Sequence, residues 1–195
     1  MIKTTAMLIE ELNQYARPAD KITRLVKEGQ VVPVVRGLYE TDPAVSGHLL
    51  AMIIYGPSYL SFEYALSDHG LIPEAVYTFT SATFEKKKKK HYETPFGLYT
   101  YRDVPSAVFP LGVELRKEGE YSFMIATAEK ALCDQLYKLS PLANYGELES
   151  LLFDDLRVDR EGFNNLSVDD VTELSKKYGS TNVKKLAGYM RRTIA

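Results

Sequence analysis

The chain has 195 residues, of which 45% are hydrophobic and 26% are charged, and this composition argues against disorder over most of its length. A single cysteine, Cys133, excludes an internal disulfide and a cysteine-rich metal site, and it suits a reducing compartment. No apolar run reaches the ~18 residues that a membrane helix needs, and acids near the amino terminus argue against a signal peptide. We therefore expect a cytoplasmic protein without a membrane partner.

The net charge of −2 hides a strong asymmetry along the chain. Residues 143–173 hold nine acids and two arginines, whereas residues 176–192 hold six bases and no acid. Residues 17–36 hold five bases and two acids. Because nucleic-acid binding responds to local patches of charge, a near-neutral total is compatible with a nucleic-acid partner.

A first helix is predicted from Thr4 or Thr5 to about residue 15, since either threonine suits the N-cap position. Its buried positions are expected to be Met7, Leu8 and Leu12, or Ile9 and Leu12. Pro18 suits the first turn of the following helix, and the two residues before it form the turn between the helices.

The second helix is predicted over residues 18–28. Ile22, Leu25 and Val26 recur at offsets of three and four, so they form one apolar face, and charged residues fall on the opposite face. Gly29 follows as a helix stop. Such a helix packs inward through its apolar face and presents charge to the solvent.

Residues 30–39 predict a small β-hairpin whose turn lies at Arg36 and Gly37, which places the arginine near the tip. Two helices followed by a hairpin with a basic tip are typical of a winged helix-turn-helix. We therefore expect a DNA-binding domain at residues 1–41 and a second domain at residues 42–195.

The sequence pattern of the second domain predicts helices, then strands, then helices again, which is typical of an α+β fold. The expected helices cover 44–55, 58–68, 127–139, 145–156, 167–178 and 181–193, and the expected strands cover 75–84, 97–104, 108–116 and 121–125. We expect a small, mainly antiparallel sheet and a helical C-terminal part. Ser167 and Asp170 are spaced as in a capping box, and Gly179 ends that helix.

The second helix is a candidate DNA reader, because a recognition helix needs cationic and polar side chains outside and fixed packing inside. The DNA-binding candidates are Lys21, Thr23, Arg24, Lys27 and, in the hairpin, Arg36. Arg24 is the best base-edge candidate, whereas Lys21 and Lys27 suit phosphate. Two acids on the same helix, Asp20 and Glu28, oppose DNA binding, so an ordinary surface helix is an equally good interpretation.

A run of five lysines follows the first predicted strand, and its members are Lys86, Lys87, Lys88, Lys89 and Lys90. Because side chains alternate along a strand, five lysines cannot all serve one face, and a loop or hairpin tip is expected. This tip either contacts phosphate without reading sequence or only increases solubility. The bases of the last helix carry the same two interpretations.

Signals for catalysis are weak. The three histidines stand in no metal-ligand spacing and there is no glycine-rich phosphate loop, so no catalytic residue, metal site or cofactor is expected. Ser58, Glu63, Asp68 and His69 crowd on one predicted helix, but local adjacency does not make a triad. We do not expect an enzyme.

Four segments in order resemble the AbiEi family of antitoxins from type IV (abortive-infection) toxin–antitoxin systems. They are KITRLVKEGQVVPVVRGLYE at 21–40, PSYLSFEYALSDHGLIPEAVYTFTSAT at 57–83, ETPFGLYTYRDVP at 93–105 and ATAEKALCDQLY at 126–137. The resemblance implies a winged-helix DNA-binding domain followed by an α+β antitoxin domain without enzymatic activity.

The resemblance also implies a function. Such a protein binds inverted repeats of double-stranded DNA in its operon promoter and represses it, and it counteracts a nucleotidyltransferase-type toxin without requiring direct contact. Symmetric operators suit a dimer on DNA. The chain departs from the family in having few residues ahead of the recognition helix. The alternative function is a protein-interaction module with a degenerate winged helix, for which the acidic residues 143–173 form a docking face.

Overall fold

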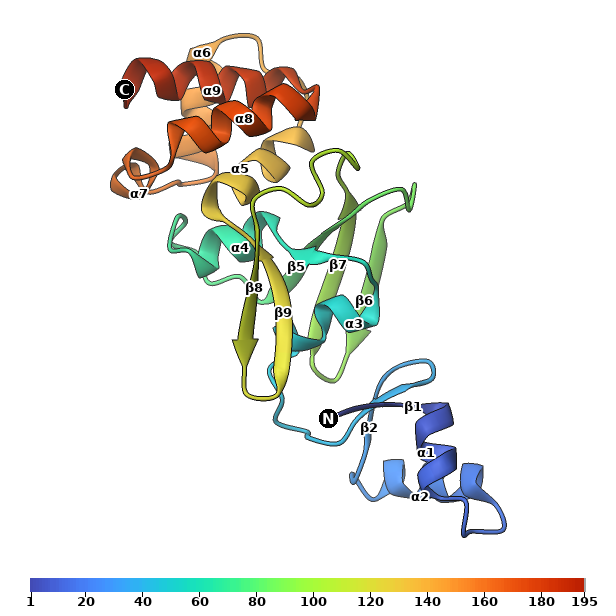
Figure 1. Cartoon of the computed structure of the whole chain (residues 1–195). Helices are drawn as coiled ribbons and strands as arrows, with labels where there is room; N and C mark the ends of the chain where they lie inside the picture. Colours follow the sequence, from blue (N-terminus) through green and yellow to red (C-terminus); the bar gives the residue numbers. More distant parts are fainter. Residues whose placement is uncertain (195) are drawn as a thin grey trace.

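The computed structural model describes residues 1–194, and its architecture is α+β, as predicted. In Figure 1 a unit formed by residues 1–41 lies at one end of the molecule and the C-terminal helices lie at the other end. A large sheet lies between them.

The N-terminal unit combines two helices with a three-stranded antiparallel sheet in the order β1-β3-β2. Its elements are β1 (Ile2–Thr4), α1 (Thr5–Glu11), α2 (Pro18–Lys27), β2 (Val32–Val35) and β3 (Leu38–Glu40). The predicted capping signals are confirmed, because Thr4 Oγ1 accepts a hydrogen bond from the backbone N of Met7 at 3.2 Å and Pro18 opens α2. Gly29, with φ +70°, follows α2 as the predicted stop.

The first helix is shorter than predicted and buries less. It ends at Glu11, and only Leu8 of its apolar residues is fully buried. The expectation that Met7 or Ile9 is buried was wrong, since their exposed fractions are 43% and 42%. A seven-residue helix has less than two full turns on its inner face, so few of its side chains reach the interior.

Glu40 attaches the N-terminal unit to the rest of the chain. Its carboxylate is completely buried and accepts hydrogen bonds from Tyr121 Oη at 2.5 Å and from the backbone N atoms of Thr41 at 2.8 Å and Asp42 at 3.0 Å. Val34 of β2 belongs to the same hydrophobic cluster as the large sheet. The small unit is therefore packed on its neighbour.

The large sheet has six strands in the order β6-β7-β5-β4-β9-β8. They are β4 (Tyr59–Leu60), β5 (Thr78–Thr83), β6 (Lys90–Thr94), β7 (Gly97–Asp103), β8 (Val113–Glu118) and β9 (Tyr121–Ala126). The pairs β4–β5, β6–β7 and β8–β9 are antiparallel, but β5–β7 and β4–β9 are parallel.

The sheet is mainly antiparallel, as predicted, since three of its five strand pairs are antiparallel, but it is larger than predicted and includes two parallel pairs. Two strands of this sheet were not predicted, and neither was β1 of the N-terminal sheet. β6 begins at the last lysine of the lysine run, and this extra strand reverses the chain so that β7 returns parallel to β5. β4 is only two residues long and lies inside a predicted helix, so it shows no recognisable alternation.

The helices surround this sheet and fill the C-terminal part. They are η1 (Gly47–Leu50), α3 (Ala51–Ile54), α4 (Phe62–Asp68), α5 (Ala128–Tyr137), α6 (Tyr145–Ser150), η2 (Leu151–Asp155), α7 (Arg160–Asn164), α8 (Val168–Tyr178) and α9 (Thr181–Thr193). Ser167 Oγ accepts from the backbone N of Asp170 at 3.2 Å, and Gly179 has φ +65°, so both predicted signals of α8 are confirmed. The predicted helix 44–55 is a 3₁₀ turn followed by the short α3.

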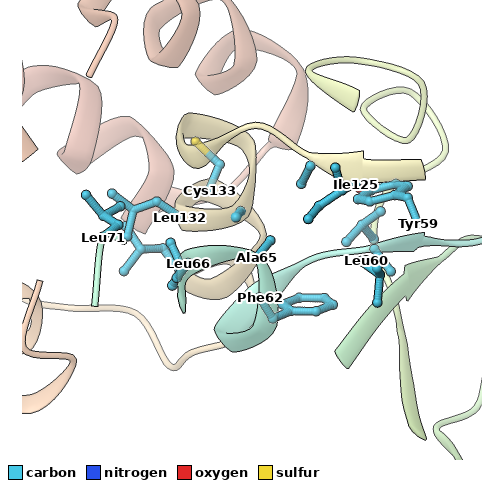
Figure 2. Close-up of a cluster of buried hydrophobic side chains, with 14 of the residues drawn as sticks. Tyr59, Leu60, Phe62, Ala65, Leu66, Leu71, Ile125, Leu132 and Cys133 are labelled. Atoms are coloured by element: carbon cyan, nitrogen blue, oxygen red, sulfur yellow. The ribbon is translucent and has the colours of Figure 1, made fainter. Parts of the chain in front are cut away.

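The central helix α5 is buried on every side from Lys130 to Leu136. It contacts α4 and β9 on one side and α8 and α9 on the other. In Figure 2, Leu132 of α5 lies beside Leu66 and Leu71, whereas Cys133 points toward the C-terminal helices. This helix connects the sheet to the C-terminal helices. No helix among the described residues is both long and apolar enough to span a bilayer.

A buried polar network is centred on Asp134 of α5. Its Oδ2 accepts from Tyr59 Oη at 2.9 Å and Ser61 Oγ at 2.7 Å, and its Oδ1 accepts from Tyr178 Oη at 2.5 Å and Lys130 Nζ at 3.1 Å. Burial, followed by the Asp134 charge, raises the pKa of Tyr59 and Tyr178, so both hydroxyls remain donors. The network joins β4, α5 and α8.

We expect Asp134→Asn to lower the free energy of unfolding by about 3–5 kcal/mol, because it leaves the Lys130 ammonium buried without a counter-charge. Lys130→Met should cost less, since Asp134 keeps three hydroxyl donors. Urea denaturation followed by circular dichroism measures both, and Asp155→Ala, an exposed acid, serves as control with a change within about 0.5 kcal/mol. A larger loss in Lys130→Met than in Asp134→Asn would contradict this account of the network.

Candidate nucleic-acid interface

The outer face of α2 carries most of the predicted DNA-binding residues. Thr23, Arg24 and Lys27 are exposed and Lys21 is half-buried. On the opposite face Ile22 is 5% exposed and fixes the helix against the unit's interior. The 3.6-residue period therefore separates the packing face from the cationic face, as predicted.

A groove of about 490 Å³ runs along this cationic face where the α1–α2 turn meets α2. It is lined by Tyr15, Ala16, Arg17, Asp20, Lys21 and Arg24. The Lys21 Nζ atom lies 5.4 Å from the centroid of the Tyr15 ring, which is 42% exposed. Tyr15 and Arg17 were absent from the sequence-based site. The sequence signal that could have identified them is an aromatic residue and a cation just before Pro18, where α2 begins.

Two acids, Asp20 in α2 and Glu28 at its C-cap, partly neutralise Arg24 and the N-cap residue Arg17. Arg17 and Asp20 approach to 3.7 Å, and Arg24 and Glu28 approach to 3.6 Å. All four side chains are at least 43% exposed, and exposed pairs of this kind contribute little free energy. Either arginine can therefore exchange its carboxylate for a stronger anionic ligand at small cost.

The hairpin presents Arg36 in its two-residue turn, where the side chain is exposed. Gly37 supplies the left-handed conformation that the turn requires, with φ +83°. The Gly37 carbonyl accepts a hydrogen bond from the backbone N of Thr5 at 3.0 Å, so the turn is held against the start of α1. Arg36 thus sits on a short, fixed hairpin of the same unit as α2.

The five lysines form a loop, as predicted, except that Lys90 begins β6. The loop is anchored at its start: Lys86 Nζ donates to the Gly56 carbonyl at 3.1 Å, and the backbone N of Lys87 donates to Asp103 Oδ2 at 2.6 Å. Figure 1 places this loop at the end of the sheet away from the N-terminal unit. The structure therefore does not bring the lysine run together with α2.

The bases of the last helix are also remote from α2 (Figure 1). Lys184, Lys185, Arg191 and Arg192 form no ion pair within residues 1–194. The Arg192 guanidinium lies 4.7 Å from the ring centroid of Tyr145 instead. The acidic residues 143–173 are thus not their ion-pair partners in this structure.

Among known proteins, no protein-family model matches the chain, and no curated protein matches it either.

The four residues considered for catalysis engage different partners. Glu63 pairs with Arg102, Asp68 pairs with Arg116 at 2.6 Å, and His69 Nε2 lies 2.7 Å from the Ala126 carbonyl oxygen. Ser58 is buried at 3% exposure. These side chains therefore do not assemble into a nucleophile, base and orienting acid.

Cys133 is completely buried, and burial raises its pKa, which disfavours the reactive thiolate. Among residues 1–194 no three His, Cys, Asp or Glu side chains are placed to hold a metal ion together.

The Glu63–Arg102 pair predicts a pH dependence of stability. Burial raises the pKa of Glu63, but Arg102 outweighs this effect, and the pKa lies below its ordinary value of 4.5. As the pH falls, the unfolded chain therefore binds the proton first. We expect the stability difference between wild type and Glu63→Gln to be full above about pH 5 and to vanish as the pH falls through the lowered pKa. Urea unfolding at pH 6 and pH 3 measures it, and an undiminished difference at pH 3 would refute the assignment.

Proposed function

We propose that residues 1–41 form a winged helix-turn-helix that reads double-stranded DNA, and that the chain is a sequence-specific transcriptional repressor and antitoxin of a type IV toxin–antitoxin system. The observation that carries this proposal is the groove on α2, where three cations and an aromatic ring converge on the face opposite the buried Ile22.

The topology of the N-terminal unit supports the proposal. A strand precedes two helices, a hairpin follows them, and the first strand pairs with the second strand of the hairpin. This order supports a winged helix-turn-helix, in which a strand, two helices and a hairpin follow one another. In helix-turn-helix proteins the second helix enters the major groove, which assigns reading to α2.

Each side chain then has a role set by its chemistry. Arg24, with its planar fork of donors, suits the edge of a guanine, and Thr23 suits either a base or a phosphate. Lys21 and Lys27 are point charges that suit phosphate. Arg36, in the hairpin turn, suits the backbone or the minor groove. The lysine run is too remote from α2 to share one short DNA site with it (Figure 1).

The antitoxin part of the proposal rests on the AbiEi resemblance of residues 57–83 and 126–137. These two segments meet in space, because they contribute Tyr59 and Ser61 on one side and Lys130 and Asp134 on the other side of the buried network. The proposed operator is an inverted repeat in the operon promoter, and a dimer suits its symmetry. The proposed functional partner is a nucleotidyltransferase-type toxin that need not be contacted directly.

We expect Arg24→Ala to lose about 1–3 kcal/mol of discrimination between the promoter fragment and random DNA, because a base-edge contact is removed. Lys27→Ala should weaken binding to both DNAs about equally and flatten the salt dependence. Fluorescence anisotropy titrations at several salt concentrations measure both effects, with the exposed Lys177→Ala of α8 as control. If the wild-type protein showed no preference for promoter over random DNA at moderate salt, the repressor proposal would fall.

The rival proposal is a protein-interaction module, and one observation favours it. Both Arg17 and Arg24 already have carboxylate partners on their own helix, as on an ordinary solvated surface. Under this proposal the Arg24→Ala variant leaves DNA binding unchanged. Pull-down of a protein partner that depends on the acidic residues 143–173, without recovery of promoter DNA, would select the rival.

A further inference from the structure

A second cationic hollow lies at the far end of the sheet from α2, where the lysine loop enters the edge strand β6 (Figure 1). Its volume is about 350 Å³, and it is lined by Lys89, Lys90, His91, Thr100, Tyr101 and Arg102. The size falls in the range of about 300–1,000 Å³ that is usual for small-molecule sites.

The pairing of β6 with β7 assembles the lining. Lys90 lies opposite Tyr101, and His91 lies opposite Thr100. Because side chains alternate along a strand, His91, Thr100 and Arg102 share one face of the strand pair, and Lys90 and Tyr101 share the other face. Tyr101 is completely buried and donates through its hydroxyl to the Ala51 carbonyl, whereas His91 is exposed. The hollow is thus built by two hydrogen-bonded strands, although a loop supplies Lys89.

The loop is held in place by groups outside the hollow. Asp103 fixes it, since its two carboxylate oxygens accept from Thr83 Oγ1 and from the backbone N of Lys87, each at 2.6 Å. Lys86 is turned away toward Gly56 and the ring of Tyr55. The run therefore divides into an anchored start and two final lysines that border the hollow.

The hollow carries excess positive charge. Lys89 and Lys90 form no ion pair within residues 1–194, whereas Arg102 is paired with Glu63. Lys138 lies close by, with Nζ donating to the Asp103 carbonyl at 2.9 Å. Desolvation lowers the pKa of Lys138, and Lys89 and Arg102 lower it further against the opposing effect of Asp103. Several cations thus repel one another at this site, and an anion would relieve that repulsion.

We propose that this hollow binds the phosphate groups of a small nucleoside phosphate. The Lys89 ammonium group and the Thr100 hydroxyl supply a charged and a neutral donor to phosphate oxygens, and Lys90, which borders the hollow from the other face of the edge strand, adds positive charge. The exposed His91 ring and the aliphatic lysine stems offer a flat and apolar surface to the base. A duplex bound to α2 would have to wrap along the whole sheet to reach the hollow, so a separate small ligand fits the arrangement better (Figure 1).

Isothermal titration calorimetry of the full chain with ADP, pyrophosphate and adenosine tests the proposal. We expect saturable binding of ADP and pyrophosphate and at least about tenfold weaker binding of adenosine, because the charge-assisted contacts go to phosphate. The double variant Lys89→Ala/Lys90→Ala should weaken ADP binding by at least about tenfold. The matched variant Lys87→Ala/Lys88→Ala removes the same charge from the same loop and should change it less than about twofold.

Several results would overturn the proposal. They are no saturable binding of ADP, equal losses in the two double variants, or displacement of ADP by a short random duplex at equal nucleotide concentration, which would make the DNA backbone the ligand. Arg24→Ala separates this proposal from the DNA-reading one, because it should leave ADP binding unchanged. If promoter binding failed, only the DNA-reading proposal would fall, because calorimetry tests the hollow separately.

Discussion

A single buried carboxylate, Asp134, organises the larger part of the molecule. Four donors from β4, the segment after it, α5 and α8 converge on its two oxygens, all within the hydrophobic cluster. An unpaired charge at this depth would be very unfavourable, so α5 has one acceptable position relative to the sheet and to the C-terminal helices. Leu132 packs against Leu66 and Leu71, as Figure 2 shows. These apolar contacts hold α5 against its neighbours, whereas the Asp134 network fixes the orientation and register of α5.

This constraint keeps the two cationic sites apart. With α5 fixed, its C-terminal end places Lys138 against Asp103 beside the lysine loop. At the opposite end, Glu40 attaches the N-terminal unit to β9 through Tyr121. The chain therefore presents an α2 face and a β6–β7 hollow that share no residue and are separated by the length of the sheet (Figure 1). Two separate ligands suit such a molecule better than one continuous contact.

The parts of the fold that depend on neighbouring residues could be predicted from the sequence. The threonine and serine caps, Pro18, Gly29 and Gly179 act within one helical turn, and the inward face of α2 follows from its period. The strands β4 and β6 could not be predicted in this way. One is two residues long, and the other is hidden by lysines that read as loop. Missing β6 also left the parallel pairing of β5 with β7 unpredicted, because β6 reverses the chain between them.

The candidate sites likewise combine features that local spacing predicts with features that only the folded structure shows. The exposure of Arg24 and Lys27 could be predicted from helical spacing, but the groove with Tyr15 depends on how the α1–α2 turn is folded. Lys130 and Asp134 are visible in the sequence as a pair at i and i+4. Their partner Tyr59 lies more than seventy residues away and appears only in three dimensions. Likewise, Lys89 and Arg102 border the same hollow because β6 pairs with β7, a pairing that no local pattern predicts.

The acids beside the α2 arginines restrict the proposed DNA reading only slightly. Asp20 and Glu28 pair with Arg17 and Arg24, so any DNA that engages these arginines must displace a carboxylate. Because both pairs are exposed, this displacement costs little free energy, and it costs the same for promoter DNA and for random DNA. Under the proposed function, discrimination therefore comes from what replaces the carboxylate. A guanine edge accepts two hydrogen bonds from Arg24 where a phosphate contact offers mainly charge, and specificity is the difference between those two affinities.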